Sequence, residues 1–396
     1  MFEREINPNA ITQADIAAGI ASYKEADTIH YPTKQADEGL RKYFPNLKPV
    51  IINCDNHSPD GTEEAFLNTE TKVPKVYITT PPNTPGKGNN FENMFRKCCE
   101  LGVKILICVD ADLESITPEW IKYMGEPIQN GYDYATPLYS RHKYDGTITN
   151  NICYPLVYGL AGINVRQPIG GDFALSGRLF EYLIRQMWHR TTKEYGIDIF
   201  LSLNAIFGGF KICKVGLGAK IHKPSAPKLG PMFLQVVSTA FNLINRNIHQ
   251  IKAVQGVKEC PLFGLRKLDP PQDLTMDREG IFNKAVKEYT QAKEDLKNLL
   301  PEEIYTTLED IFSNKEINRL DAQLWTKIIY QVIAAFSKAL DPAKVVESLR
   351  GLYFGRVVSF MNQTWEMSSE EAEKYIIEQA KIFFDNRQYF LQISAY

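Results

Sequence analysis

The chain has 396 residues, 44% of them hydrophobic and 23% charged, which is an ordinary globular balance and enough length for about two domains. Its 45 Lys and Arg residues nearly match its 47 Asp and Glu residues, so the net charge of -2 gives no general electrostatic basis for nucleic-acid binding. The seven cysteines form no CxxC pair, so we expect neither a zinc site nor a disulfide framework. The N-terminal stretch lacks the apolar core of a signal peptide, and no run reaches the ~18 apolar residues of a membrane span, so we expect a cytoplasmic protein.

Short apolar runs alternate with amphipathic patterns over the first 225 residues, which is typical of an α/β layered domain. The helix expected after Thr117 has the clearest start, because Pro118 occupies its first position and Pro favours that position. In chain order, the sequence predicts a strand at 15–22, a helix at 26–44, strands at 49–55 and 75–80, a helix at 91–102, a strand at 104–110, a helix at 117–131 and a last strand with its exit at 209–224.

The composition changes after KPSAPKLGP, residues 223–231. From residue 232 onward apolar residues recur three and four apart, which predicts helices, and only residues 260–273 form an irregular interruption. We therefore expect an α/β domain over residues 1–228 and a helical subdomain over residues 229–396. The apolar helix faces are more typical of an internal core than of a subunit contact, but they leave a homodimer open.

The expected strand at 104–110 ends in Asp110-Ala111-Asp112, which places two carboxylates one residue apart. Unpaired charges are costly to bury, so these groups should lie near water, a cation or a ligand. Together they could hold a divalent cation, which in turn could bridge a diphosphate. The alternative is a helix N-cap, because Asp is common before a helix. The buried strand before them and a glycine-lysine turn upstream favour the metal site.

That upstream turn is TPGKGNN, in which Gly86 and Gly88 flank Lys87 just before an expected helix. Glycines let the backbone approach an anion closely, and a helix start adds favourable N–H groups. Lys87 would then act as a point charge on a phosphate. The spacing is not that of a P-loop. The alternative is an ordinary glycine-rich turn with a solvated lysine.

Three more polar residues stand at expected strand or helix ends, namely Asp172, Asp198 and His222. A neutral imidazole at His222 could complete the metal shell begun by Asp110 and Asp112, although spacing alone favours a histidine ordered at a domain junction. Asp172 and Asp198 could accept hydrogen bonds from sugar hydroxyls, or they could cap helices. The residues by themselves leave these alternatives open.

Taken in order, the segments IASYKEADTI, NCDNHSPDGT, PGKGNN, VDADLESITPEWI, QPIGGDFALSG, YGIDIFL and KIHKPS resemble a GT-A glycosyltransferase. The nearest resemblance is to the retaining enzymes that make glucosylglycerate, glucosyl-3-phosphoglycerate and mannosylglycerate. It covers about residues 15–225, and seven motifs in the correct order are specific although each is weak alone. It implies a Rossmann-like GT-A domain over residues 1–228, a UDP- or GDP-hexose donor, a Mg²⁺ or Mn²⁺ ion and transfer with retained anomeric configuration.

The resemblance also implies roles for individual residues. Asp112 would be the principal metal ligand, with Asp110 beside it and His222 as the third ligand. Asp198 and Asp172 would border the sugar and the acceptor as the catalytic pair. Asp55 would bond the base and Lys87 would contact the nucleotide end. The residues expected at the donor are Ala21, Tyr23, Glu25, Asp55, Lys87, Asp110 and Gly171.

Residues 140–157, SRHKYDGTITNNICYPLV, resemble the acceptor segment of the phosphoglycerate enzymes. Those enzymes carry an Arg directly after the Gly, whereas Thr147 follows Gly146 here, and a neutral hydroxyl does not replace a bidentate cation on a phosphate. Arg141, His142 and Lys143 lie nearby and could compensate. We expect a bare carboxylate acceptor such as D-glycerate, held by Arg141, Gly146, Thr147 and Thr149.

The sequence therefore predicts a metal-dependent hexosyltransferase, with glucose as the favoured sugar and a role in compatible-solute synthesis implied by the resemblance alone. Because no carboxylate is an obvious nucleophile, we expect same-face attack by an acceptor hydroxyl whose proton passes to the leaving phosphate. Asp198 would orient that hydroxyl or stabilise the positive sugar. The alternatives are a GT-A enzyme acting on 3-phosphoglycerate, a polysaccharide or a lipid carrier, a nucleotidyltransferase, and a non-catalytic sugar-nucleotide-binding protein.

Overall fold

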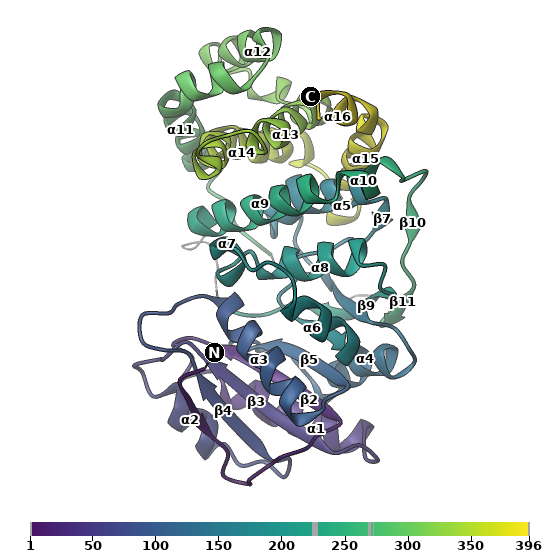
Figure 1. Ribbon diagram of the computed structural model, residues 1–396. Helices are drawn as coiled ribbons and strands as arrows, with labels where there is room; N and C mark the ends of the chain where they lie inside the picture. Colours follow the sequence, from purple (N-terminus) through teal and green to yellow (C-terminus); the bar gives the residue numbers. More distant parts are fainter. Residues whose placement is uncertain (1, 224–228, 268–270, 272, 395–396) are drawn as a thin grey trace. The chain divides into compact units, whose positions relative to one another are not determined.

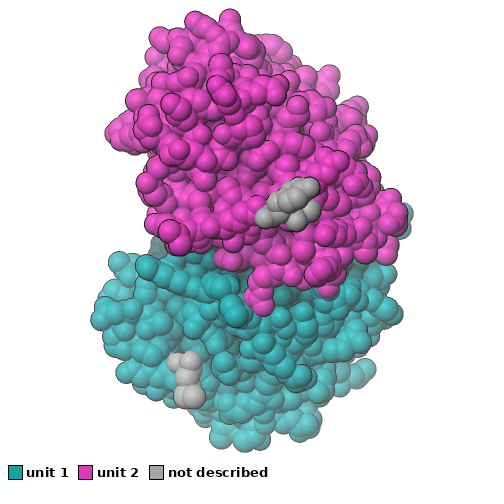
Figure 2. All heavy atoms as spheres, turned by 45° about the horizontal axis from the view of Figure 1, so that its top comes forward, with its two compact units in different colours: residues 1–140, 169–229, 260–271 teal, residues 141–168, 230–259, 272–396 magenta. Residues whose placement is uncertain are grey.

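The structure is a computed structural model that describes residues 2–223, 229–267, 271 and 273–394. The chain divides into two compact units, which have different colours in Figure 2. Unit 1 comprises residues 1–140, 169–229 and 260–271, and unit 2 comprises residues 141–168, 230–259 and 272–396. The chain thus passes repeatedly from one unit to the other.

Unit 1 is built on one mixed sheet (Figure 1). Its strands are β1 (Arg4–Ile6), β2 (Ile16–Ser22), β3 (Pro49–Asp55), β4 (Lys75–Thr79), β5 (Ile105–Asp110), β6 (Tyr134–Ser140), β8 (Phe173–Ser176), β9 (Ile212–Ala219) and β11 (Leu262–Gly264). They lie in the order β1-β4-β3-β2-β5-β8-β6-β9-β11. Strands β2 to β5 are parallel, β8 is antiparallel to both β5 and β6, and β9 is parallel to β6.

Helices cover both faces of this sheet, and the alternation of side chains along β2 shows which face each helix covers. Ile16, Ala18 and Ile20 belong to the apolar core shared with the first and fourth helices. Gly19 points to the other face, where an added Cβ would lie 2.2 Å from Sδ of Met94 in the third helix. The helices of unit 1 are α1 (His30–Tyr43), α2 (Thr62–Asn68), α3 (Lys87–Leu101), α4 (Pro118–Gln129), α6 (Gly177–Ile184), α7 (Arg190–Lys193) and α8 (Ile197–Phe207).

The carboxyl ends of the parallel strands meet at one edge of the sheet. Ser22 of β2 pairs with Asp55 of β3, Asp55 pairs with Thr79 of β4, and Ala21 of β2 pairs with Asp110 of β5. Because β8 is antiparallel to both neighbours, β6 and its parallel partner β9 end at this same edge. Ligands bind at such edges in open α/β sheets, and this edge gathers the predicted strand-end residues.

Unit 2 is mainly helical, and most side chains of its helix α14 are buried. This helix packs against α11, while α15 packs against α5. No helix in the described parts of the chain is long and apolar enough to cross a membrane. The elements of unit 2 are the π-helix η1 (Thr149–Cys153), α5 (Tyr154–Ala161), β7 (Ile163–Asn164), α9 (Leu229–Arg246), α10 (Ile248–Lys252), β10 (Lys258–Glu259), α11 (Arg278–Leu299), α12 (Glu302–Ser313), η3 (Ile317–Arg319), α13 (Ala322–Phe336), α14 (Pro342–Thr364), α15 (Ser369–Asp385) and α16 (Arg387–Ile393).

The predicted fold class is confirmed, with strands β2 to β5 found within one residue of the predicted bounds. The sheet is mixed rather than parallel, because β8 inserts antiparallel between β5 and β6. Helix α3 begins at Lys87, four residues before the predicted start, since Gly86 adopts a φ of 123° as its N-cap. Strands β1, β8 and β11 were not predicted, because they are too short to show alternating positions. Strand β6 was not predicted because Pro137 interrupts its run, and proline argues against a strand.

The predicted division at residue 228 differs from the observed one. Residues 141–168 belong to unit 2, although they stand in the middle of the predicted α/β domain. Residues 260–271 belong to unit 1, where β11 pairs with β9 at the end of the sheet. The composition of the chain changes only once, so it predicts a single boundary. Residues 141–168 and 260–271 each belong to a different unit from the residues on either side of them, because their contacts are with that unit.

Candidate active site

The centre of the carboxyl edge is Asp110, whose two oxygens each accept a hydrogen bond from a lysine. Nζ of Lys87 lies 2.7 Å from Oδ1, and Nζ of Lys220 lies 2.7 Å from Oδ2. Burial opposes the charged form of Asp110, but the two ammonium groups outweigh it and hold the pKa of Asp110 well below its usual range. In the structure Asp110 therefore binds two lysines, whereas its position in the sequence predicted that it would bind a metal ion or the donor.

Lys220 was not predicted from the sequence, although it makes ion pairs with two carboxylates of the site, as the predicted Lys87 does. Its ammonium also lies 2.7 Å from Oδ2 of Asp172 and donates to the carbonyl oxygen of Gly170 at 2.9 Å. The side chain is only 5% exposed. The available signal was its position two residues before His222, because alternate residues of an extended segment point to the same side.

Asp172 is 1% exposed and binds protein groups through both oxygens. Oδ1 accepts the backbone N–H of Asp110 at 2.8 Å, and Oδ2 accepts the hydroxyl of Tyr139 as well as the ammonium of Lys220. This carboxylate thus fixes the position of Asp110 and Lys220. Its predicted contact with sugar or acceptor has no support in this geometry, and a supporting role fits the buried contacts better.

Asp198 differs from Asp172, because one of its oxygens has no hydrogen-bond partner among the described residues. Oδ2 accepts the backbone N–H of Gly171 at 2.9 Å, whereas Oδ1 is buried without a hydrogen bond and lies 3.8 Å from Nζ of Lys87. Burial raises the pKa of Asp198 above its usual value. A buried carboxylate oxygen that lacks a donor is suited to a ligand hydroxyl or to positive charge that develops on a ligand.

Gly171 is required beside these groups. Its φ is 91°, in the region that favours glycine. An added Cβ would lie 2.3 Å from Oδ2 of Asp110 and 2.7 Å from Nζ of Lys220. Any side chain here would therefore separate Lys220 from Asp110.

Asp112 and His222 form the part of the site that fits a divalent cation. Burial first, and then the charges of Asp110 and Glu25, raise the pKa of Asp112, while His222 is close enough to oppose that rise. In the described residues no hydrogen bond or ion pair engages the carboxylate of Asp112, and no three His, Cys, Asp or Glu side chains are arranged to hold a metal. Two protein ligands suit Mg²⁺ or Mn²⁺, which usually keep water and bind phosphate oxygens as well. The predicted three-residue set with Asp110 is not formed, because Asp110 binds lysines.

The predicted base contact of Asp55 is at odds with the structure. Asp55 is fully buried, and each oxygen already accepts two hydrogen bonds, from the hydroxyls of Ser22 and Ser58 on Oδ1 and from the Ser58 N–H and the Tyr77 hydroxyl on Oδ2. Such a carboxylate has no lone pair left for a base. Asp55 instead orders the loop after β3. At the same edge, Ala21 lies at the end of β2, and Tyr23 and Glu25 lie in the loop that follows it. The Tyr23 side chain is 47% exposed.

The glycines around Lys87 permit close packing rather than an anion cradle. An added Cβ at Gly88 would lie 2.0 Å from the carbonyl oxygen of Thr192, and one at Gly86 would lie 2.3 Å from that of Lys193. The N–H of Gly88 donates to the carbonyl oxygen of Glu194 at 3.1 Å. These contacts seat the start of α3 on the end of α7, and so they direct Lys87 toward Asp110.

The predicted acceptor residues Arg141, Gly146, Thr147 and Thr149 all belong to unit 2. The Thr147 hydroxyl lies 2.6 Å from that of Tyr353, and Thr149 is buried in η1. Arg141 pairs with Asp145 at 3.6 Å, and Gly146 has a φ of 68°. Nζ of Lys143 donates to the carbonyl oxygens of Thr364, Trp365 and Met367 at 2.8, 3.0 and 2.5 Å, so this lysine caps the end of α14.

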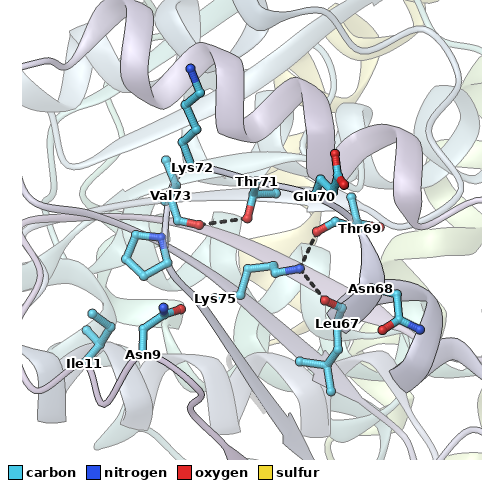
Figure 3. A pocket seen from close by; sticks show the side chains of 11 residues that line it. Asn9, Ile11, Leu67, Asn68, Thr69, Glu70, Thr71, Lys72, Val73 and Lys75 are labelled. Carbon is cyan, nitrogen blue, oxygen red and sulfur yellow. Dashed lines mark hydrogen bonds between the residues drawn. The ribbon is translucent and has the colours of Figure 1, made fainter.

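A hollow of about 520 Å³ in unit 1 shares no residue with this site (Figure 3). It is lined by residues 67–75 together with Asn9 and Ile11. Nζ of Lys75 donates to the carbonyl oxygens of Phe66, Leu67 and Thr69 at 3.0, 2.7 and 2.5 Å, and burial lowers the pKa of Lys75. All three N–H groups are thus used to close the end of α2, and none is directed into the hollow.

Part of the chain matches a known protein family. Residues 20–182 match the model of the family described as glycosyl transferase family 2. None of the curated proteins compared with the chain matches it. The matched segment runs from the end of β2 into α6, and with the sheet order it is that of a glycosyltransferase domain of the GT-A fold.

Solved structures of glucosyl-3-phosphoglycerate synthase from Mycobacterium tuberculosis are similar to this chain. The complex with Mn²⁺, UDP and glucosyl-3-phosphoglycerate has a TM-score of 0.47 and 22% identity, over 58% of this chain and 80% of that one. The complex with Mn²⁺, UDP-glucose and glycerol 3-phosphate has a TM-score of 0.45 and 21% identity, over 58% and 80%.

Proposed function

We propose that the protein is a metal-dependent retaining glycosyltransferase that moves a hexose from a nucleotide-sugar to a small carboxylate acceptor such as D-glycerate. The observation that carries this proposal is the Lys87–Asp110–Lys220 cluster next to Asp112 at the carboxyl edge of a family 2 domain. Two ammonium groups beside Asp112, whose carboxylate has no hydrogen bond or ion pair among the described residues, are suited to a diphosphate and the cation that accompanies it.

Asp112 and His222 are the residues that would hold the metal ion. When bound, a divalent cation there supplies Lewis-acid stabilisation of the leaving nucleoside diphosphate. Lys87 and Lys220 add positive charge at the same edge, and Asp110 keeps both ammonium groups in place. Their positions are set before the substrate arrives, which is what makes fixed charges effective in stabilising a transition state.

Asp198 is the candidate for the reacting sugar or the acceptor hydroxyl. Its Oδ1 is buried and receives no hydrogen bond from the part of the chain that the structure describes, so a ligand O–H would satisfy it. As a carboxylate it would also stabilise positive charge that develops on the sugar ring. Asp110 and Asp172 are not free to act as nucleophiles, because both bind lysines, and Asp112 is the candidate metal ligand. Same-face attack, with the leaving phosphate taking the proton, therefore remains the proposed course.

The preference for a bare carboxylate rests on the acceptor segment. Thr147 stands where the phosphoglycerate enzymes, by resemblance, carry an Arg, and its hydroxyl contacts Tyr353. Lys143 could have replaced that Arg, but its ammonium donates hydrogen bonds to three carbonyl oxygens of unit 2. The cation that would most simply compensate for the missing Arg is therefore committed elsewhere.

The test is a turnover screen with Mg²⁺ or Mn²⁺ that crosses UDP-glucose, GDP-glucose and GDP-mannose against D-glycerate and 3-phosphoglycerate. Formation of a glycosylglycerate that keeps the donor's anomeric configuration, and its loss in Asp112→Asn, is the expected result. Product with 3-phosphoglycerate alone would contradict the proposed acceptor. Product with inverted configuration would contradict the proposed course, and turnover without a metal ion would contradict the metal assignment.

A further inference from the structure

The segment Ile221–Lys223, which carries His222, leaves the sheet after β9 and is held on two sides. On one side the carbonyl oxygen of Ile221 accepts the N–H of Glu114 at 2.9 Å, and its own N–H donates to Oγ of Ser115 at 3.0 Å. These contacts tie it to the loop that follows Asp112. The segment is therefore anchored to the element that carries the other candidate metal ligand.

On the other side Lys223 reaches the loop after β2. Its ammonium lies 2.8 Å from Oε2 of Glu25 and 2.7 Å from Oδ1 of Asp27. The side chain of Glu25 is 14% exposed and that of Lys223 is 37% exposed, so this contact is partly shielded from solvent. We call this set, Lys223 with Glu25 and Asp27, the Lys223 latch.

The loop that the latch grips is itself ordered. The N–H of Glu25 donates to Oγ1 of Thr62 at 2.9 Å, and the N–H of Ala26 donates to Oδ2 of Asp60 at 3.2 Å. Oε2 of Glu25 also accepts the hydroxyl of Thr28 at 2.9 Å. Because this carboxylate is held in place, the ammonium of Lys223 is held in place as well. The Lys223 latch therefore restricts where His222, the preceding residue, can lie relative to the loop after β2.

The latch also balances charge at the cation site. Glu25 and Asp110 both lie near enough to Asp112 for their negative charges to act on its carboxylate. Asp110 is balanced by Lys87 and Lys220, whereas Lys223 is the cation bound to Glu25. A free Glu25 would be able to turn toward any cation at Asp112 and compete with the arrangement that includes His222.

We propose that Lys223 is a positioning residue, whose latch to Glu25 and Asp27 fixes His222 and the loop after β2 in the arrangement that receives a nucleoside diphosphate with its divalent cation. This inference rests on the proposed function and adds a residue to it. Lys223 touches neither substrate nor cation. It acts through His222 beside it and through Glu25 in the loop that it holds.

A partly exposed ion pair normally contributes little to folding stability, so stability and ligand binding should respond differently. The test compares Lys223→Met with Lys223→Arg, which can keep both ion pairs. Lys42→Met is the matched control, because Lys42 joins α1 to Glu119 at 3.3 Å through an exposed pair with no contact to the site. Thermal midpoints, calorimetric binding of Mn²⁺ with UDP and amide hydrogen exchange are measured on each full-length variant.

For Lys223→Met we expect binding of Mn²⁺ with UDP to weaken about 10- to 100-fold, the loss that is typical when a residue that orients a metal ligand is replaced. The thermal midpoint should match that of Lys42→Met. Amides of residues 25–28 and of Ile221 should exchange faster, and Lys223→Arg should recover most of the affinity. In turnover, the KM for the donor should rise more than kcat falls.

Two results would overturn the inference. One is wild-type affinity in Lys223→Met, and the other is unchanged exchange of residues 25–28 and Ile221. If the wild-type protein does not bind Mn²⁺ with UDP at all, the proposed function fails. The exchange measurement then decides the latch separately, because it needs no ligand: faster exchange supports a latch that holds the two segments, and unchanged exchange refutes it.

Discussion

Replacing Lys220 by Met removes the cation that joins the two buried carboxylates of the site. Met keeps the length of the side chain and its apolar stem, so the change is mainly one of charge and hydrogen bonding. Asp110 and Asp172 each lose a contact of 2.7 Å, and the carbonyl oxygen of Gly170 loses its donor. Lys87 still balances Asp110, but Asp172 keeps only uncharged donors from Tyr139 and the backbone.

The expected cost follows from burial. Lys220 is 5% exposed and the Asp172 side chain 2%, and removal of one partner of a buried ion pair typically costs about 3–5 kcal/mol. At about 2–4 °C per kcal/mol for a unit of this size, the thermal midpoint should fall by about 6–20 °C. The double variant Lys220→Met with Asp172→Asn should lose less than the sum of the two single changes, because no unbalanced charge remains.

Scanning calorimetry of wild type, the two single variants and the double variant measures this coupling. Lys42→Met serves as the control for loss of an exposed lysine and should shift the midpoint far less. A midpoint for Lys220→Met within about 2 °C of wild type would refute the reasoning, since the ion pairs would then not be buried as described. Strict additivity in the double variant would show that Lys220 and Asp172 do not interact.

Four further results are expected. Asp198→Asn should raise or keep the thermal midpoint, because burial raises the pKa of Asp198 and the stability of the wild type falls as pH rises through that pKa; a lowered midpoint would contradict this. Transfer by the same variant should fall at least about 100-fold, because the charge that faces the ligand is lost. The depressed pKa of Asp110 should contribute stability that is present above about pH 4 and lost as pH falls below it, so pH-dependent melting should show a weaker acid loss in Asp110→Asn. Mn²⁺ with UDP should raise the melting temperature of wild type but not of Asp112→Asn, and an equal rise would refute the metal assignment. Lys143→Met should destabilise the protein by about 1–3 kcal/mol in urea unfolding, through the lost cap of α14, and an unchanged midpoint would argue against that cap.

The strand-end chemistry could be predicted because it depends on local pattern. Apolar runs that finish in polar residues locate β2, β3 and β5, and parallel strands must end at a common edge. Asp112 and His222 were predicted at this edge, and the structure places them just after β5 and β9, which both end there; that they bind a metal ion stays a prediction. Asp198 was placed at the start of an apolar helix, and it is there, in α8.

Residue type did not reveal which polar groups are already satisfied by the protein. Asp55, Asp110 and Asp172 are all acidic residues at strand ends, yet their oxygens bind serine, tyrosine or lysine groups from other elements. The sequence similarly suggests that Lys143 is a free cation, but its ammonium caps the end of α14 at Thr364, 221 residues further along the chain. Hydrogen-bond saturation depends on partners that are distant in sequence, so it becomes visible only when the fold brings them together.

By itself the sequence determined the α/β class, the helical C-terminal part and the edge of the sheet where chemistry is concentrated, because periodicity and strand ends are encoded within short windows. Only the tertiary structure decided that Lys220 completes the site, that Gly171 must lack a side chain beside it and that residues 141–168 belong to unit 2. Lys220 and Asp172 are 48 residues apart, and no periodic pattern links them. They meet because β8 enters the sheet antiparallel between β5 and β6, and pairing between distant strands is set by the packing of the whole unit.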